Sequence, residues 1–303
     1  MNDEAERVNN RRPSALPLVD ATSKKRLLHE PPLLSSVALA WRGIIVELHR
    51  LKPQELPEHY VVGHGLSVNT GQHPVGFGWT DKGRRLEGQI NPGAFHLLTH
   101  GEHNVPRWLQ TFDNVSLVLD RKFVADTVSG DLPADRIEFA TQRSATDAII
   151  ASYAEAFLSE LRTNGDNGLL YVDTLTTGLT LHLLSSYGIA KPRMPIPKAK
   201  LNSFQLRTIV DFVQSNLEGD ISLVTLAEQV RVSPFHLARQ FRATVGVAPH
   251  QFVLRQRIQK SIRLIRAGKL PLAQIAVESG FHDQSHLTRS FRKLLGTTPA
   301  QYD

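Results

Sequence analysis

A repeated segment in the last third of the chain limits the fold more than any other feature of the sequence. Residues 234–252 align with residues 284–302 when they are shifted by 50 positions. The identical pairs are His236/His286, Leu237/Leu287, Arg239/Arg289, Phe241/Phe291, Arg242/Arg292, Gly246/Gly296, Pro249/Pro299 and Gln251/Gln301. An internal repeat of this kind predicts two copies of one supersecondary unit.

The first copy predicts a helix, a tight turn and a second helix. Apolar residues recur at helical spacing over Val224–Val230. Ser233 can cap the next helix, and Pro234 suits its first position. This second helix is expected over Pro234–Val245 and ends at Gly246, a residue type that often terminates helices.

The second copy predicts the same arrangement. A first helix is expected over Pro271–Ser279, and Gly280 supplies the turn. Asp283 is the expected cap of a helix over Gln284–Leu295, which Gly296 ends. A glycine-containing turn between two short helices is typical of the helix-turn-helix motif.

The second helix of each copy has an apolar face and a polar face. The inward-facing residues are Leu237 and Phe241 in one copy and Leu287 and Phe291 in the other. The opposite faces carry Phe235, His236, Arg239 and Arg242, and Ser285, His286, Arg289 and Arg292. An arginine on such a face can bridge guanine O6 and N7 in the major groove. A basic face that meets only solvent is the alternative, but its repetition favours double-stranded DNA.

Positive charge is concentrated in the same region. Residues 201–303 hold 13 Lys and Arg against 7 Asp and Glu, whereas residues 1–200 hold 22 of each. A basic domain beside a neutral one indicates a polyanionic partner, with a well-solvated surface as the alternative. A Lys- and Arg-rich helix is expected over residues 250–267. It should place the two recognition helices about one DNA turn, ~34 Å, apart.

Three segments of the repeat region are similar to the signature of the AraC/XylS family of bacterial transcription regulators. They are Ile275-Ala276 through Gly280-Phe281, Ser285 through Lys293, and Gly296 through Tyr302, and the resemblance covers residues 203–303. It implies base contacts by Phe235, Ala238, Arg239, Ser285, His286 and Arg289. Ala238 departs from the longer polar residues that are frequent at its position. Phosphate contacts are expected from Arg242, Arg292, Lys293 and the connecting helix.

The front part of the chain predicts a β-rich domain followed by two helices. Glycine and proline interrupt short apolar runs such as residues 43–48 and 115–119, a pattern typical of an antiparallel sandwich or barrel. From about residue 144 the spacing becomes helical, with four apolar residues four apart: Ile149, Tyr153, Phe157 and Leu161. The chain is therefore expected to be an α+β protein. By resemblance to the same family, its sheet would form a cupin-like antiparallel β-barrel.

The predicted domains follow from these patterns and from a proline-rich stretch that disfavours helix. They are a disordered tail (1–30), a cupin-like effector-sensing domain (31–140), a helical dimerisation element (141–190), a linker (191–200) and an AraC-type DNA-binding domain (201–303). The last contains helix-turn-helix units at 223–246 and 271–296, joined by the connecting helix 250–267.

Seven of the 13 histidines lie between residues 49 and 103. A metal site is one interpretation, because neutral imidazole is a common ligand. The chain has no His-x-His pair of the kind typical of cupin metal sites, so no metal and no cofactor are expected. The alternative is barrel histidines, some of which line a pocket for an organic effector. The predicted pocket residues are Tyr60, His64, Phe77, Trp79, His96 and Trp108.

The second helix of the 141–190 element carries an apolar stripe at three- and four-residue spacing. We call Val172, Leu175, Leu179 and Leu183 the predicted dimer seam, because a stripe this narrow resembles a short coiled coil. A homodimer is therefore expected. Packing of the stripe within the chain itself is the alternative.

These observations predict a regulator that binds promoter DNA and responds to a small-molecule effector, with RNA polymerase as a further partner. No catalytic motif such as Gly-x-Ser-x-Gly occurs, so no enzymatic activity is expected. Two alternatives stay open: a cupin enzyme fused to a DNA-binding domain, and a constitutive regulator whose front half only dimerises. The absence of cysteine and of long apolar runs predicts a cytoplasmic protein without a membrane partner.

Overall fold

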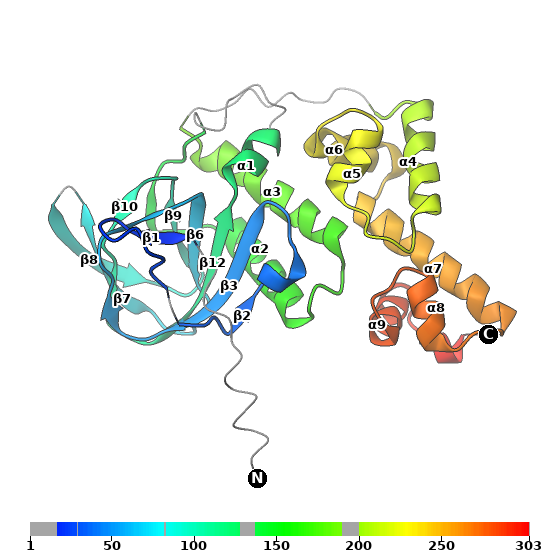
Figure 1. The fold of residues 1–303 in the computed structure, drawn as a ribbon, viewed down its shortest axis with the longest axis horizontal. Coiled ribbons are helices and arrows are strands. Elements are labelled where there is room, and N and C mark those ends of the chain that lie inside the picture. Colours follow the sequence, from blue (N-terminus) through cyan, green and yellow to red (C-terminus); the bar gives the residue numbers. More distant parts are fainter. Residues whose placement is uncertain (1–16, 29, 82, 128–136, 190–199, 303) are drawn as a thin grey trace, which may run out of the picture. The chain divides into compact units, whose positions relative to one another are not determined.

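The computed structural model describes residues 17–28, 30–81, 83–127, 137–189 and 200–302. It divides into two compact units. The first comprises Met1–Asn164 and Gly178–Met194, and the second comprises Gly165–Thr177 and Pro195–Asp303. Antiparallel sheets dominate the first unit and helices form the second (Figure 1), which confirms the predicted α+β class.

A six-stranded antiparallel sheet forms the base of the first unit, with the strand order β13-β9-β6-β12-β3-β2. Its strands are β2 (Leu34–Ser35), β3 (Ile44–Leu51), β6 (His64–Asn69), β9 (Ala94–Leu98), β12 (Phe112–Leu119) and β13 (Gln142–Thr146). Side chains alternate between the two faces of each strand. Along β12, Val115, Leu117 and Leu119 share one face and are fully buried, while Asn114 and Ser116 share the other.

Two smaller antiparallel sheets complete the β part of this unit. One has the order β4-β11-β7-β8 and contains β4 (Gln54–Glu55), β7 (Val75–Asp81), β8 (Arg84–Ile90) and β11 (Arg107–Trp108). The other has the order β1-β5-β10 and contains β1 (Leu18–Asp20), β5 (His59–Val61) and β10 (His103–Asn104). Within the described ranges the three sheets remain separate, so closure of the predicted barrel is not confirmed.

Helices pack beside the six-stranded sheet. They are α1 (Arg121–Thr127), α2 (Ala148–Arg162) and α3 (Leu169–Tyr187), and α2 packs on β2, β3 and β12. Asp147 caps α2 by accepting the backbone N–H groups of Ile149 and Ile150. The same carboxylate binds His182 Nε2 at 2.7 Å and the Tyr187 hydroxyl at 2.8 Å, so it joins the start of α2 to the end of α3.

The N-terminal region differs from the predicted tail. Leu18–Asp20 forms strand β1 and pairs with β5. Leu18 and Leu28 also contribute apolar side chains to the cavity described below and pack on a cluster of buried strand residues. Residues 1–16 of the predicted tail lie outside the described residues. The predicted linker 191–200 does too, except for Lys200.

Helix α3 corrects the predicted dimer seam. Val172, Leu179 and Leu183 are 1%, 1% and 0% exposed in the single chain, and Leu175 is half-buried. Threonines on the other faces of α3, such as Thr176 and Thr180, are buried as well. A helix that is buried on most sides belongs to the core of its own chain. The structure therefore favours the alternative, in which this stripe packs within the chain.

Within its described residues, the second unit contains six whole helices, a short 3₁₀ turn and the first half of α3. The whole helices and the turn are α4 (Ser203–Ser215), α5 (Leu223–Gln229), α6 (Pro234–Val245), α7 (Pro249–Ala267), α8 (Leu272–Glu278), α9 (Gln284–Leu295) and η3 (Pro299–Gln301). The pairs α5–α6 and α8–α9 are the two predicted helix-turn-helix units, and α7 is the predicted connector. Helix α4 was not predicted. The sequence also did not predict that residues 165–177 belong to this unit.

The predicted helix boundaries are confirmed by their capping contacts. Ser233 Oγ accepts the His236 backbone N–H at 3.3 Å, and Asp283 accepts that of His286 at 2.7 Å. Helices α6 and α9 end at Gly246 and Gly296, both in the left-handed conformation. The two copies therefore begin and end by the same local chemistry.

Each helix-turn-helix unit has its own apolar core on the shared helix α7. The first cluster includes Leu226, Leu237, Phe241 and Val253, and the second includes Ile258, Ile275, Leu287 and Phe291. Val253 and Ile258 both lie on α7, five residues apart. Helix α7 thus links the two cores. None of the helices in the described ranges is long and apolar enough to cross a membrane.

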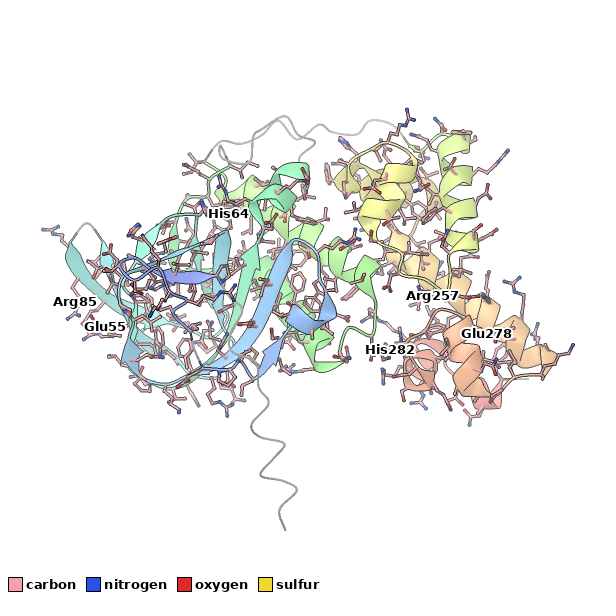
Figure 2. All side chains as sticks on the ribbon, viewed as in Figure 1. Glu55, His64, Arg85, Arg257, Glu278 and His282 are labelled. Carbon is pink, nitrogen blue, oxygen red and sulfur yellow. The ribbon has the colours of Figure 1, made fainter. Side chains whose placement is uncertain are left out.

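Arg257, which is labelled in Figure 2, lies where three segments of the second unit meet. From α7, its Nε donates to the Leu217 carbonyl at 3.0 Å and its Nη2 to the Gly219 carbonyl at 2.8 Å, both just beyond α4. Gly280, in the turn of the second helix-turn-helix unit, lies against the same groups. A Cβ atom there would come within 1.9 Å of the Leu217 carbonyl oxygen. We call these contacts the Arg257 junction.

The junction predicts unequal effects of two glycine substitutions. Gly280→Ala and Gly296→Ala both place alanine at a positive φ, of +85° and +75°, but a Cβ at Gly296 meets nothing within 4 Å. Both variants should lose ~1–2 kcal/mol to backbone strain. Gly280→Ala should lose a further ~1–3 kcal/mol, because Leu217 must move. Urea unfolding of the two full-length variants measures the difference, and equal losses would contradict the close packing at Gly280.

Candidate DNA interface and ligand cavity

Helix α6 presents one face to the core and another to solvent. Leu237 and Phe241 are fully buried, whereas Arg239 and Arg242 are exposed. Arg239 lies near the middle of the helix, and Arg242 lies one turn further on. The exposed face of α6 therefore carries two positive charges, and neither guanidinium pairs with a carboxylate of the described residues.

The other two predicted base contacts on α6 are less accessible. Phe235 is 9% exposed and stacks on His236, with 5.5 Å between the ring centroids. Ala238 packs partly against the first core cluster. Their contact with bases stays a prediction, and Arg239 is the exposed residue among the three predicted base contacts on α6.

Helix α9 repeats this arrangement. Leu287 and Phe291 are fully buried, and Ser285, Arg292 and Lys293 are exposed. The helix begins directly after Asp283, whose carboxylate accepts a backbone N–H. Ser285 thus lies in the first turn of α9, the part of a recognition helix that usually meets base edges.

His286 lies inside the second helix-turn-helix unit. Its ring is 6% exposed and packs edge-on against Phe281, with centroids 5.0 Å apart. Its Nδ1 accepts the His282 backbone N–H at 3.4 Å. Burial lowers the pKa of His286 to about 4, so the ring is neutral at neutral pH. A base contact by His286 stays a prediction, and this structure gives its ring a packing role.

Arg289, the counterpart of Arg239, forms an ion pair with Asp166. Asp166 belongs to the second unit and lies just before α3. Its side chain is 15% exposed, while that of Arg289 is 53% exposed. The two equivalent arginines therefore differ: Arg239 is open, and the guanidinium of Arg289 is held by a carboxylate.

The segment that carries Asp166 is anchored in the second unit by buried contacts. Asp173 accepts the Leu223 backbone N–H, at the start of α5, at 3.0 Å. Leu170 belongs to the first core cluster. Tyr171 packs edge-on against His250, with centroids 5.2 Å apart. Asp166 is therefore held near α9 by packing and hydrogen bonds as well as by its own ion pair.

The connecting helix α7 offers fewer free cations than its sequence predicts. Arg257 is engaged in the junction, and Lys260 binds Glu218 at 2.6 Å. Arg255, Arg263 and Arg266 are exposed. These three, with the predicted phosphate contacts Arg242, Arg292 and Lys293, form the candidate electrostatic surface of the unit.

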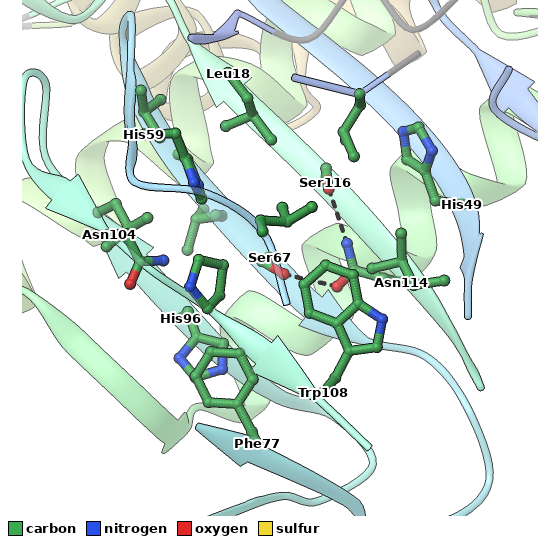
Figure 3. Close-up of a pocket in the computed structure, with 18 of the residues that line it drawn as sticks. Leu18, His49, His59, Ser67, Phe77, His96, Asn104, Trp108, Asn114 and Ser116 are labelled. Atoms are coloured by element: carbon green, nitrogen blue, oxygen red, sulfur yellow. Dashed lines mark hydrogen bonds between the residues drawn. The ribbon is translucent and has the colours of Figure 1, made fainter. Parts of the chain in front are cut away.

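The first unit encloses a cavity of about 100 Å³ between its sheets (Figure 3). Apolar side chains make up most of its wall, including Leu66, Phe77, Trp108 and Phe112. The polar residues that line it are His49, His59, Ser67, His96, Asn104, Asn114 and Ser116. A largely apolar cavity with a few converging polar groups is the usual form of a small-molecule site.

The predicted pocket residues separate into two sets. Phe77, His96 and Trp108 line the cavity. The other three do not: Tyr60 stacks on His103, His64 packs edge-on against Phe139, and Trp79 stacks on Phe77. That an effector touches the first three stays a prediction.

The histidines of the first unit have individual partners. His49 Nε2 lies 3.1 Å from Glu47, His59 Nδ1 donates to the Pro57 carbonyl at 3.0 Å, and His100 Nδ1 accepts the Gly63 N–H at 3.1 Å. Burial lowers the pKa of His64 to about 4 and that of His96 to about 3. Among the described residues, no three His, Asp or Glu side chains converge as metal ligands would.

Several functional candidates escaped sequence reasoning. Leu18 and Leu28 line the cavity from a stretch predicted to be disordered. Ser67 and Asn114 face it from apolar strands, where polar residues at alternate positions were the available signal. Asp166 had no such signal, because its partner Arg289 lies 123 residues away.

Comparison with known proteins finds similarity to transcription regulators, and one family match lies within the second unit. The family described as a helix-turn-helix domain matches residues 226–303. The probable transcriptional regulator LumQ of Photobacterium leiognathi is 27% identical over 215 residues, which cover 70% of this chain and 80% of LumQ. The multiple antibiotic resistance protein MarA of Escherichia coli (strain K12) is 26% identical over 101 residues, 33% of this chain and 80% of MarA.

Among solved structures, a transcriptional regulator from Chromobacterium violaceum, described as AraC-type DNA-binding domain-containing, overlaps the chain with a TM-score of 0.31. It is 26% identical, and the match covers 32% of this chain and 88% of that structure.

The Asp166–Arg289 pair predicts that removing one charge strengthens DNA binding. Asp166→Asn frees the guanidinium of Arg289 for a base or phosphate. On a duplex selected by the full chain from a random pool, its affinity should rise about two- to fivefold, the value of a partly exposed ion pair. Asp211→Asn, at an exposed position on α4, removes the same charge elsewhere and is the matched control. Equal effects of the two substitutions in a binding titration would show that the pair does not restrain Arg289.

Proposed function

We propose that this chain, a DNA-binding transcription regulator of the AraC family, is controlled by a small molecule that binds in the cavity of its first unit. Its second unit would read two neighbouring segments of promoter DNA through α6 and α9. The observation that carries the DNA-reading part of the proposal is the pair of arginines, Arg239 and Arg289, at equivalent positions of two capped helices. Both helices pack on α7, so one framework presents both side chains.

Each part of the second unit has a stated role in this proposal. Arg239 and Arg289 read guanine edges, and Ser285 meets a base from the first turn of α9. Arg242, Arg292 and Lys293 bind phosphates and supply salt-dependent affinity. Asp166 competes with DNA for Arg289, so this arginine contacts DNA only when the ion pair is broken.

Effector control is supported by the cavity. Apolar side chains form most of its wall, and His96 and Asn104 in that wall carry buried polar atoms without a partner among the described residues. A unit that only held two subunits together would gain nothing from such groups, because buried unpaired polar atoms cost free energy. This argument favours a ligand-responsive regulator over the constitutive one.

The cupin enzyme remains the alternative from another class. The relatives named above are described as a transcriptional regulator and a resistance protein, not as enzymes. Elemental analysis of protein purified without chelator separates the two readings. A stoichiometric transition metal would favour the enzyme, since cupin catalysis commonly relies on a bound metal, and the proposal expects none. A homodimer, a cytoplasmic location and contact with RNA polymerase stay predictions of the sequence.

Sequence-specific binding predicts that two arginines matter more on the selected duplex than on random DNA. Arg239→Ala and Arg289→Ala should each cost ~1–3 kcal/mol on the selected duplex and relax the preference at one base position. Arg207→Ala, an exposed arginine on α4, removes the same charge and should have little effect on either DNA. Fluorescence anisotropy titrations at fixed salt make the comparison. Equal losses on selected and random DNA would reduce both arginines to phosphate contacts.

A further inference from the structure

We propose that the cavity of the first unit binds a small uncharged molecule with an apolar body and one polar group that both accepts and donates a hydrogen bond, as an alcohol or a primary amide does. This inference rests on the proposed effector site and names the chemistry of its ligand. It follows from the size of the cavity, from unpaired polar atoms on two residues of its wall and from the lack of Lys, Arg, Asp and Glu there.

The size of the cavity limits the ligand. Its volume is about 100 Å³, and leucine, valine and aromatic side chains form most of the wall. A dry apolar cavity of about 150 Å³ in another protein admits benzene, so this one suits a body of about four to six heavy atoms. Larger ligands would have to displace the wall.

One side of the cavity holds polar residues that are already paired (Figure 3). Ser116, Ser67 and His96 are cross-strand neighbours in register on β12, β6 and β9. Ser67 donates to Asn114 Oδ1 at 2.7 Å, and Asn114 Nδ2 donates to Ser116 Oγ at 2.8 Å. These three side chains satisfy one another, which leaves His96 at the end of the row.

His96 offers a free donor. The Ser144 backbone N–H donates to His96 Nδ1 at 3.2 Å, so Nδ1 carries no proton and the neutral ring carries it on Nε2. Burial lowers the pKa of His96 to about 3, with a smaller effect from Arg143. Phe77 packs on the ring, with centroids 4.2 Å apart, and fixes its plane. His96 is 6% exposed, and its Nε2 has no hydrogen-bond partner among the described residues.

Asn104 offers a free acceptor. It lies on β10 directly opposite His59 on β5, and both line the cavity. Asn104 is 7% exposed, and its Oδ1 has no partner in the described part of the chain. An unpaired buried donor and acceptor each cost free energy in the empty cavity. In the proposed complex, the polar group of the ligand reaches both atoms and recovers this cost, which an alkane cannot do.

The wall excludes a charged ligand. No Lys, Arg, Asp or Glu is among the described residues that line the cavity. Glu47, on the same strand as His49, already accepts hydrogen bonds from Ser35 and His49. Arg143 lies outside the wall and binds Glu102 at 3.0 Å. A carboxylate or ammonium group would therefore lose its hydration without meeting a counter-ion.

Four probes with one branched carbon skeleton test this chemistry on the full chain. Isobutyramide and isobutanol are neutral, isobutyrate is an anion, and isobutylammonium is a cation. Chemical-shift titration of histidine-labelled protein reports binding next to His96. The amide and the alcohol should bind, and isobutyrate should bind at least about tenfold more weakly than the isosteric amide, because its charge is desolvated without a partner.

A pair of histidine variants tests the donor. His96→Leu should weaken isobutyramide binding roughly two- to tenfold, the value of one hydrogen bond. His100→Leu is the matched control, because His100 Nδ1 also accepts a backbone N–H but does not line the cavity. It should leave the affinity unchanged. Thermal melts show whether each variant is folded. If His96→Leu does not fold, the comparison of isobutyramide with isobutyrate in the unchanged chain still tests whether the cavity prefers an uncharged ligand.

The outcomes separate this inference from the proposed function. Equal or tighter binding of isobutyrate or isobutylammonium would overturn the uncharged class and leave an effector site in place. Equal weakening by both histidine variants would overturn the role of His96 as donor. No binding of any of the four probes would overturn the cavity as a ligand site, and effector control through it would fall as well.

Discussion

The buried guanidinium of Arg257 is the interaction on which the arrangement of the second unit depends. It reaches from α7 to the carbonyl groups of Leu217 and Gly219, which follow the C-terminal end of α4, where a helix favours positive charge. Burial lowers the pKa of Arg257, but an arginine remains charged at neutral pH. Gly280 allows the turn of the second helix-turn-helix unit to lie against Leu217. Any larger residue at this position would place a Cβ atom in collision with the Leu217 carbonyl. The segment that follows α4, the connector and the second motif therefore meet in one small region.

This junction matters because each helix-turn-helix unit packs on a separate core. Val253 belongs to one cluster and Ile258 to the other, so the continuity of α7 and the Arg257 junction hold the two clusters together. A fixed spacing between α6 and α9 is what allows two short helices to recognise one longer DNA site. The ion pair between Asp166 and Arg289 affects how the second recognition helix can contact DNA. It leaves the helices in place and occupies one of the two equivalent side chains.

The comparison of sequence with structure separates local from long-range information. Ser233, Asp283, Gly246 and Gly296 were predicted in their capping roles, because a cap depends only on residues a few positions away. The apolar stripe of α3 was also recognised, but its spacing could not say which surface would cover Leu179, and the chain's own core does.

The cavity depends on information that the sequence carries only weakly. His96 faces the cavity because β9 pairs with β6 in a register that places it beside Ser67. His64, on β6 itself, packs on Phe139 instead. A one-residue change of register would exchange the faces, so composition alone could not distinguish these two histidines.

Guanine methylation interference on a duplex selected by the full chain tests most directly whether two helices on one framework read one DNA site. The framework described here predicts two clusters of interfering guanines, centred about one helical turn, or roughly 10 base pairs, apart on one face of the duplex. A single cluster of a few base pairs would contradict it, because only one recognition helix would then enter a major groove.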